Sequence, residues 1–238
     1  MLVILKQKRL SEIQRDFVNN MAHEFQTPIT AIMASSEMLK DSDIINNPQR
    51  LNSYATIIYT EINKLRVQVQ RVLEMAGAES EAVALNKTHV DVHDILRETI
   101  SKFIQSAGID ESCIQLDLNA GTYQINCDAL HLSNIIYNLL DNAVKYSAET
   151  IAVQVSTIAD KNGIVISIAD KGIGIDAKDL KKIFNKFYRV SQGNRHDVKG
   201  FGLGLSYVKL LVEAHRGTVD VKSKTNEGTT FILFFPFK

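Results

Sequence analysis

Apolar residues in the first third of the chain recur at intervals of three and four, which is the spacing of amphipathic helices. Between residues 6 and 40 they are Leu10, Ile13, Phe17, Met21, Ile29, Ile32, Met33, Met38 and Leu39. Between residues 49 and 76 they are Leu51, Tyr54, Ile58, Ile62, Leu65, Val69 and Val72. The segment "DSDIINNPQ" separates the two runs with Asp, Asn and Pro, which favour a turn. The pattern therefore predicts an antiparallel helical hairpin.

One hairpin buries its two apolar stripes poorly, whereas two hairpins can pair as a four-helix bundle. We therefore expect residues 1–76 to form a dimerisation domain. Residues 77–87, "GAESEAVALNK", are mostly small and acidic, as is typical of a linker. Residues 88–238 are expected to form a second domain.

In several segments of that second domain, apolar and polar residues alternate instead of following the helical spacing. The segment "THVDVHDIL" alternates and then turns into a helix, and strands are predicted at "CIQLDL", "YQIN", "TIAVQVSTI", "GIVISIAD", "TVDVKS" and "TTFILFFPF". The turns "ADKNG" and "TNEG" predict two antiparallel hairpins. Helices are expected up to about Ser106, after a cap at Asp128, over "DAKDLKKIF", and from the glycine-rich turn to a cap at Gly217. This order indicates an α+β fold, a mixed sheet with helices on one face.

The composition is that of a globular protein, with 45% hydrophobic and 23% charged residues. Lys+Arg and Asp+Glu are both 27, so the net charge is zero and gives no support to a nucleic-acid partner. Cys113 and Cys127 lack Cys-x-x-Cys spacing, and we interpret them as small apolar residues in a reducing compartment.

No run approaches the roughly 18 apolar residues of a membrane-spanning helix. The opening "MLVIL" is followed at once by "KQKR". We favour the end of a membrane helix with its positive cytoplasmic flank. The alternative is an artificial start and a frayed helix end.

The stretch "ADKGIGID" combines a strand end, Asp170, with Gly172 and Gly174. Glycines let a backbone approach a planar ligand, and a carboxylate there can accept a hydrogen bond from an exocyclic amine. An ordinary strand-ending turn is the alternative. In "KGFGLGLSYVKLL", Gly200, Gly202 and Gly204 lead into a helix N-terminus, which favours phosphate. That pattern is neither a P-loop nor a dinucleotide fingerprint.

In "NIIYNLLDNAVKYS", Asn138 and Asn142 share one helix face, and an amide oxygen suits Mg²⁺. Hydrogen bonds from these amides to neighbouring backbone are the alternative. The segment "IFNKFYRVSQGNRHDVKG" resembles a lid that brings cations to a triphosphate. We favour that role for Arg189, and a solvated loop for Arg195, His196 and Lys199.

Together, in this order, these motifs resemble the core of a sensor histidine kinase of a two-component system. "HEFQTP" resembles the H-box, "NLLDNAVKYS" the N-box, "DKGIGI" the G1-box, "FNKFYR" the F-box, "GFGLGLS" the G2-box and "EGTTF" the terminal element. The resemblance runs from about residue 8 to the end. It implies a phosphoacceptor hairpin followed by a Bergerat-fold ATP-binding domain.

The resemblance implies that His23 is phosphorylated, that Glu24 is the general base, and that Thr27 orients water for dephosphorylating the regulator. The nucleotide-binding residues it implies are Asn138, Asn142, Lys145, Tyr146, Asp170, Gly172, Gly174, Arg189, Gly200, Gly202, Leu203, Gly204, Leu205 and Thr229. Asn142 corresponds to the Mg²⁺ ligand. The implied cofactors are ATP and Mg²⁺. The implied partners are a second copy of the chain and the receiver domain of a response regulator, and the full-length protein is expected in a bacterial inner membrane.

Phe25 and Gln26 stand where the H-box usually has Leu and a basic residue. Phe201 stands where the segment before the G2-box often has a small residue. Pro28 lies inside the predicted helix, where it should loosen the backbone beside Glu24. Two alternative functions are an inactive dimeric scaffold and an ATPase without phosphorelay. A gyrase-type ATPase would carry Glu four residues before the Mg²⁺ ligand, where this chain has Asn138.

Overall fold

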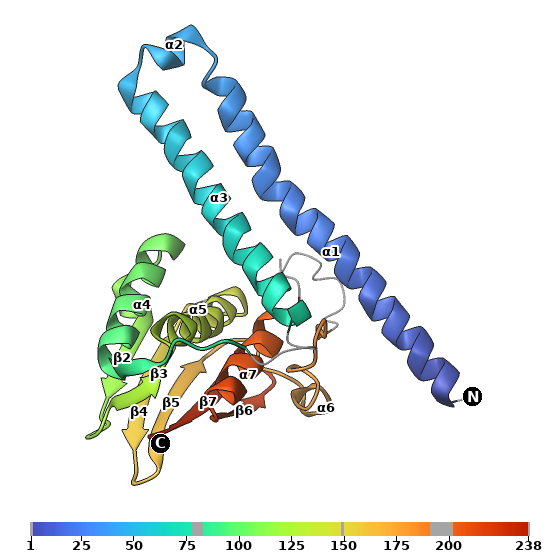
Figure 1. The fold of residues 1–238 in the computed structure, drawn as a ribbon, viewed down its shortest axis with the longest axis vertical. Coiled ribbons are helices and arrows are strands. Elements are labelled where there is room, and N and C mark those ends of the chain that lie inside the picture. The colour runs from blue at the N-terminus through green and yellow to red at the C-terminus, as the bar shows by residue number, and fades with distance from the viewer. Residues whose placement is uncertain (1, 78–82, 149, 191–201, 238) are drawn as a thin grey trace. The chain divides into compact units, whose positions relative to one another are not determined.

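The computed structural model of the protein describes residues 2–77, 83–148, 150–190 and 202–237 (Figure 1). The chain divides into two compact units, one built from the N-terminal helices and one from the α/β segment. Within the described residues, no helix has the length and apolar character needed to cross a membrane.

The N-terminal unit is a helical hairpin (Figure 1). Its helices are α1 (Leu2–Met38), α2 (Ser42–Ile45) and α3 (Pro48–Gly77). The long helices α1 and α3 pack along each other. The Asn47 side chain accepts the N–H of Arg50 at 3.1 Å, and Pro48 stands at the first helical position, where its missing N–H costs nothing. The predicted hairpin is confirmed, and its loop contains one additional helical turn, α2.

Helix α1 runs through Pro28 without ending, and the Pro28 side chain is buried. Proline leaves the carbonyl of Glu24 without its usual N–H partner. On either side of this position, Thr27 Oγ1 donates to the His23 carbonyl at 3.3 Å and Thr30 Oγ1 to the Gln26 carbonyl at 2.8 Å. Such bonds commonly accompany bent helices. A bend at Glu24 stays a prediction.

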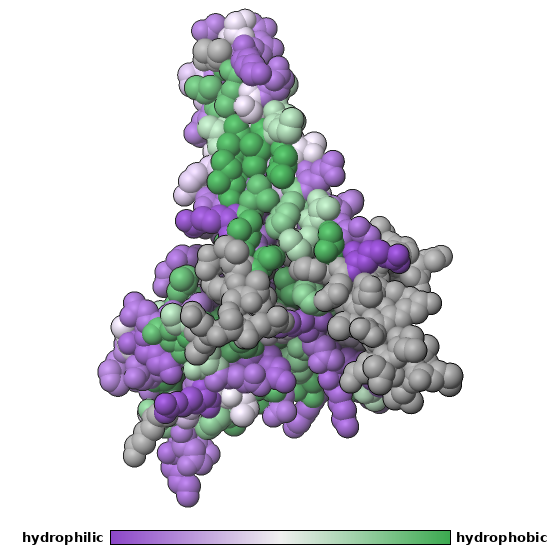
Figure 2. All heavy atoms as spheres, turned by 45° about the vertical axis from the view of Figure 1, so that its right-hand side comes forward, coloured by the Kyte–Doolittle hydropathy of each residue, from purple (hydrophilic) through white to green (hydrophobic). Residues whose placement is uncertain are grey.

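The hairpin exposes a long apolar surface, visible as a green stripe in Figure 2. Met33 and Tyr59 are 67% and 71% exposed. Other exposed apolar residues of α1 and α3 are Val18, Ile29, Met38, Leu51, Ile57, Ile62, Val67 and Val69. A continuous exposed apolar surface of this kind marks an association site.

The α/β unit contains a five-stranded mixed sheet in the order β2-β4-β5-β7-β6, with β2 and β6 at its edges. Its strands are β2 (Ile114–Leu118), β4 (Val153–Ala159), β5 (Gly163–Asp170), β6 (Thr218–Lys224) and β7 (Gly228–Pro236). Strands β2 and β4 are parallel, and the other neighbours are antiparallel. Strands β1 (Thr88–Asp91) and β3 (Gln124–Cys127) form a separate antiparallel pair.

Four α-helices complete the described part of this unit, together with a short 3-10 turn at Glu111–Cys113. They are α4 (Val92–Ala107), α5 (Ala129–Lys145), α6 (Ala177–Leu180) and α7 (Gly204–Ala214). Helix α5 packs against both α4 and α7, and α5 and α7 also contact the sheet. The predicted α+β class and both predicted strand hairpins are confirmed.

The core lies between these helices and alternate residues of the central strands. Val155, Ile166 and Leu233 are fully buried, as are Leu139 on α5 and Val208 on α7. Both cysteines are free thiols. Cys127 is 1% exposed, so the interpretation of this residue as a small apolar core residue is confirmed, and its burial raises the pKa of the thiol to about 12.

The end of α7 corrects one expectation. The left-handed residue that ends the helix is Arg216, with φ 61°, not Gly217. Gly217 follows it and donates its N–H to the Val212 carbonyl at 2.9 Å, while Arg216 donates to Glu213 at 2.9 Å. These two bonds form a Schellman motif. Glycine is needed at 217 for another reason: a Cβ there would lie 2.2 Å from the backbone oxygen of Phe234.

Gly217→Ala should therefore lower the free energy of unfolding of the α/β unit by about 1–3 kcal/mol, because β7 or the end of α7 must move. Urea unfolding followed by circular dichroism measures the change. Gly121→Ala is the matched control, since a Cβ at Gly121 meets nothing within 4 Å. Equal stability of the two variants would contradict the close-approach explanation.

Candidate functional site

One face of α1 carries the predicted phosphoacceptor residues. His23, Gln26, Thr27 and Thr30 follow the helical spacing of three and four, and they line a common hollow. All four are exposed, whereas Glu24 is half-buried. An exposed imidazole with a carboxylate next to it in the chain can be reached by a phosphoryl donor. Gln26, the residue that replaces the usual basic residue of the H-box, thus lies on the same face as His23.

The second group of predicted residues gathers around the end of β5. Asp170 Oδ1 accepts two backbone N–H groups, from Gly172 at 2.8 Å and from Thr229 at 3.2 Å. Burial raises the pKa of the Asp170 carboxyl, although both hydrogen bonds act in the opposite direction. Oδ2 makes no hydrogen bond to any of the described residues. One oxygen therefore fixes the side chain, and a role of the other toward a ligand stays a prediction.

The glycine turn after β5 is held from two sides. Ile173 donates its N–H to the Tyr146 carbonyl at 3.1 Å, and its own carbonyl accepts the N–H of Asn226 at 2.8 Å. A Cβ at Gly172 would lie 2.3 Å from the Tyr146 oxygen, and one at Gly174 would lie 2.0 Å from a backbone oxygen. Close approach to protein backbone thus explains both glycines. Approach to a ligand stays a prediction.

Ser223 on β6 is a positioning residue that sequence reasoning missed. Its hydroxyl accepts the N–H of Ile175 at 2.8 Å, donates to the Gly228 carbonyl at 2.8 Å, and lies 2.9 Å from Thr229 Oγ1. Ser223 therefore connects the glycine turn to Thr229. Ser223 on β6 stands directly opposite Thr229 on β7. A prediction of how these two strands pair would therefore have identified Ser223 as a neighbour of Thr229.

The amide and lysine side chains of α5 are already engaged. Asn138 is buried, and its Nδ2 donates to the Asn134 carbonyl at 2.7 Å, as the alternative interpretation expected. Its Oδ1 faces Gly204, the first residue of α7, 3.4 Å from where a Cβ would stand. Lys145 pairs with Asp141 at 2.6 Å.

Asn142 is half-buried one turn before Tyr146, whose N–H donates to the Asn142 carbonyl at 3.0 Å. An amide oxygen at this position fits a Mg²⁺ that takes its other ligands from phosphate oxygens and water. The described residues contain no group of three His, Cys, Asp or Glu side chains that could hold a metal alone.

The segment after α6 is braced by aromatic side chains. Tyr188 donates its hydroxyl to Asp179 at 2.7 Å, and the rings of Phe184 and Phe231 meet edge to face. Arg189, which follows Tyr188 directly, is exposed.

The glycine-rich approach to α7 is described only in part. Gly202 has φ 69°, Leu203 is buried and Leu205 is half-buried. The predicted residues that lie outside the described residues are Gly200, Phe201, Arg195, His196 and Lys199. The structure thus joins Asp170, Thr229 and the glycine turn directly, and links Asn138 to the start of α7.

Two family models match this arrangement. One describes the His Kinase A phospho-acceptor domain and covers residues 13–81. The other describes the ATPase shared by histidine kinases, DNA gyrase B and HSP90, and covers residues 127–238. The chain belongs to the histidine kinase family: it carries a phosphoacceptor hairpin followed by a kinase-type ATPase domain.

Individual relatives agree with this assignment. Sensor protein RprX of Bacteroides fragilis is 41% identical over 236 residues, which are 98% of this chain and 46% of RprX. The chain thus spans less than half of that relative. Full-length ShkA in complex with AMPPNP has the same fold, with a TM-score of 0.65 and 24% identity over 94% of this chain and 46% of ShkA. ThkA in complex with the response regulator TrrA gives a TM-score of 0.60 and 23% identity over 98% of this chain and 64% of that one.

Proposed function

We propose that this chain phosphorylates its own His23 from ATP and passes the phosphoryl group to an aspartate of a separate response regulator. The observation that carries the proposal is the combination, in one chain, of an exposed histidine beside Glu24 with the oriented carboxylate of Asp170. The family assignment supports the same pairing of phosphoacceptor and nucleotide site.

In the proposed step, the unprotonated ring nitrogen of His23 forms a bond to the γ-phosphorus of ATP. The bond from that phosphorus to the β–γ bridging oxygen breaks, and its electron pair leaves with ADP. Glu24 accepts the proton of the other ring nitrogen or holds it by a hydrogen bond, which keeps electron density at the attacking nitrogen. The exposure of the His23 side chain is consistent with attack on a bound donor.

We assign Asp170 Oδ2 to the exocyclic amine of adenine, because Oδ1 is occupied by Gly172 and Thr229. Asn142 is the residue we assign to Mg²⁺, which when bound offsets negative charge on the phosphate oxygens. Lys145 would exchange Asp141 for a phosphate oxygen. We place Arg189 at the γ-phosphate. The complex of ShkA with AMPPNP supports a nucleotide of this type.

We further propose that two copies pair through the apolar stripe of α1 and α3, which a single hairpin leaves exposed (Figure 2). The receiver domain of a response regulator is the proposed second partner, supported by the complex of ThkA with TrrA. Thr27 would orient water for dephosphorylating that regulator, after releasing the carbonyl of His23. The membrane location of the whole protein stays a prediction.

Incubation of the full chain with γ-labelled ATP and Mg²⁺ tests the proposal. The expected product carries label that is lost in acid and retained in alkali, the signature of an N-phosphohistidine, with release of one ADP per label. Release of inorganic phosphate without labelled protein would indicate an ATPase without phosphorelay. Absence of nucleotide binding would indicate a scaffold. Either result would refute the kinase.

A further inference from the structure

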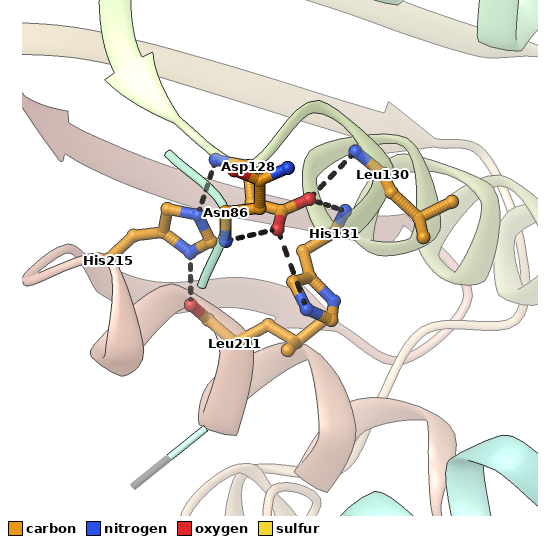
Figure 3. Close-up of polar contacts among 6 residues, drawn as sticks. All are labelled: Asn86, Asp128, Leu130, His131, Leu211 and His215. Carbon is orange, nitrogen blue, oxygen red and sulfur yellow. Dashed lines mark hydrogen bonds and ion pairs between the residues drawn. The ribbon is translucent and has the colours of Figure 1, made fainter. Parts of the chain in front are cut away.

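A second polar cluster lies at the opposite end of α5 from the candidate nucleotide site (Figure 3). It consists of Asp128, His131 and His215, which are 8%, 7% and 5% exposed. Asp128 precedes α5 by one residue, and Asn142 lies 14 residues later, about 20 Å along the helix. None of the three side chains takes part in the chemistry described above.

Asp128 joins two segments of chain through its two carboxylate oxygens. Oδ1 accepts the N–H groups of Leu130 at 3.0 Å and His131 at 3.1 Å, which caps α5 as predicted. Oδ2 accepts the N–H of Asn86 at 2.9 Å, in the segment that leads from the linker into β1. Burial alone would raise the pKa of Asp128, but these hydrogen bonds hold it below its ordinary value.

His215, at the end of α7, holds the backbone of Asp128 (Figure 3). Its Nε2 accepts the N–H of Asp128 at 3.0 Å, and its Nδ1 donates to the Leu211 carbonyl at 2.7 Å. A backbone N–H can only donate and a carbonyl can only accept, so the two partners fix both ring nitrogens. The ring must be neutral, with its proton on Nδ1. A proton added at Nε2 would face the N–H of Asp128 and break that bond.

The surroundings of His215 disfavour the charged ring. Burial is the main reason that its pKa lies below the ordinary value of 6.5, and the positive charge of Lys87 and the His131 ring act in the same direction. The Leu211 carbonyl and the Asp128 carboxylate act against it. The neighbouring ring of Phe235 on β7 carries no charge.

His131 is the second histidine of the cluster. Its Nε2 lies 3.9 Å from Asp128 Oδ2, too far for a hydrogen bond, and within the described residues its buried Nδ1 has no partner. His131 thus leaves Oδ2 of Asp128 to the N–H of Asn86. The contact of Asp128 that a proton would remove is the one to Nε2 of His215.

We propose that Asp128 and His215 form a proton-sensitive joint that holds Asn86 against the start of α5 at neutral pH and releases it in mild acid. The joint connects the linker to α5 and α7, the two helices that meet at Asn138 and Gly204. Its regulatory consequence rests on the proposed function: acid should slow labelling of His23, because the linker connects the phosphoacceptor hairpin to the nucleotide domain.

Amide hydrogen exchange in the full chain, followed by NMR, tests the joint without any nucleotide. Between about pH 7.5 and about pH 4.5, a window that extends below the ordinary histidine pKa because burial lowers the pKa of His215, the protection factors of Asn86 and Asp128 should fall together by about tenfold, the effect of losing one hydrogen bond. The nitrogen shifts of His215 should show the Nδ1-protonated tautomer at neutral pH. Constant protection, or a different tautomer, would overturn the proposal.

Variants separate the joint from general acid effects. His215→Gln provides a neutral acceptor for the Asp128 N–H, so the acid step should disappear. Asp128→Asn keeps a capping oxygen but has only one, so Asn86 should lose protection at every pH. The step should persist in His89→Gln, an exposed control, and in His93→Gln, which removes a buried histidine that lies outside the cluster and contacts Thr157.

An acid step that survives in His215→Gln, or disappears in His93→Gln, would overturn the assignment. Labelling of His23 is the functional readout: acid lowers the yield of the acid-labile label in both proteins, and the decrease should be severalfold larger in the wild type than in His215→Gln. A missing label with an intact acid step would contradict the proposed kinase and leave the joint established.

Discussion

Replacement of His23 by Gln should abolish acid-labile labelling of the protein by γ-labelled ATP. Gln keeps a polar side chain of similar reach on the exposed face of α1, but its amide nitrogen has no lone pair available for attack on phosphorus. Nothing in the α/β unit changes, so the affinity for nucleotide should stay within about twofold of wild type. Filter-bound label and fluorescence titration with a nucleotide analogue measure the two quantities.

His89→Gln is the matched control, because His89 is also exposed but lies on β1 of the other unit. This variant should label like the wild type. Persistent acid-labile label in His23→Gln would place the phosphoacceptor at another histidine. Loss of label together with loss of nucleotide binding would mean that the substitution had damaged the protein rather than removed a nucleophile.

Asp170→Asn should reduce nucleotide affinity by about 100-fold or more, because an oriented acceptor becomes a donor. The Asn oxygen can replace Oδ1 and keep the bonds from Gly172 and Thr229. Its amide nitrogen then occupies the place of Oδ2 and opposes the exocyclic amine of adenine. Titration calorimetry with ADP and Mg²⁺ measures the loss, and labelling of His23 should fall in parallel at limiting ATP.

Asp160→Asn offers a closely matched control at the opposite end of β5. There too, one carboxylate oxygen accepts two backbone N–H groups, from Asn162 at 2.7 Å and Gly163 at 3.1 Å. Asp160 is exposed in the β4–β5 turn, so its substitution should leave nucleotide affinity unchanged. If both variants bind nucleotide normally, the assignment of Asp170 to adenine is wrong.

Local features of the fold were predictable because they depend on neighbours in sequence. Helical spacing located α1 and α3, alternation located β4, β5 and β7, and the Asp128 cap followed from residue type. The misplaced left-handed residue at Arg216 shows the limit of that approach. The preference for glycine in left-handed backbone predicted the cap at Gly217. The residue is glycine instead because its backbone lies close to that of Phe234.

The candidate site was predictable only as a set of residue types. Its partnerships join distant segments: Thr229 meets Asp170 across 59 positions, and Ile175 meets Ser223 across 48. Such contacts depend on strand register and helix packing, which periodicity does not specify. Ser223 was missed for this reason, since only its place opposite Thr229 distinguishes it from other serines.

The two edge strands of the sheet bear on how the protein behaves at high concentration. The exposed positions of β6 include Asp220, Lys222 and Lys224, whereas those of β2 are Gln115 and Leu116. Charged side chains on an edge strand discourage the addition of a strand from another molecule. Growth of the sheet into fibrils is therefore disfavoured at the β6 edge, and β2 is the edge at which crowded copies would add a strand.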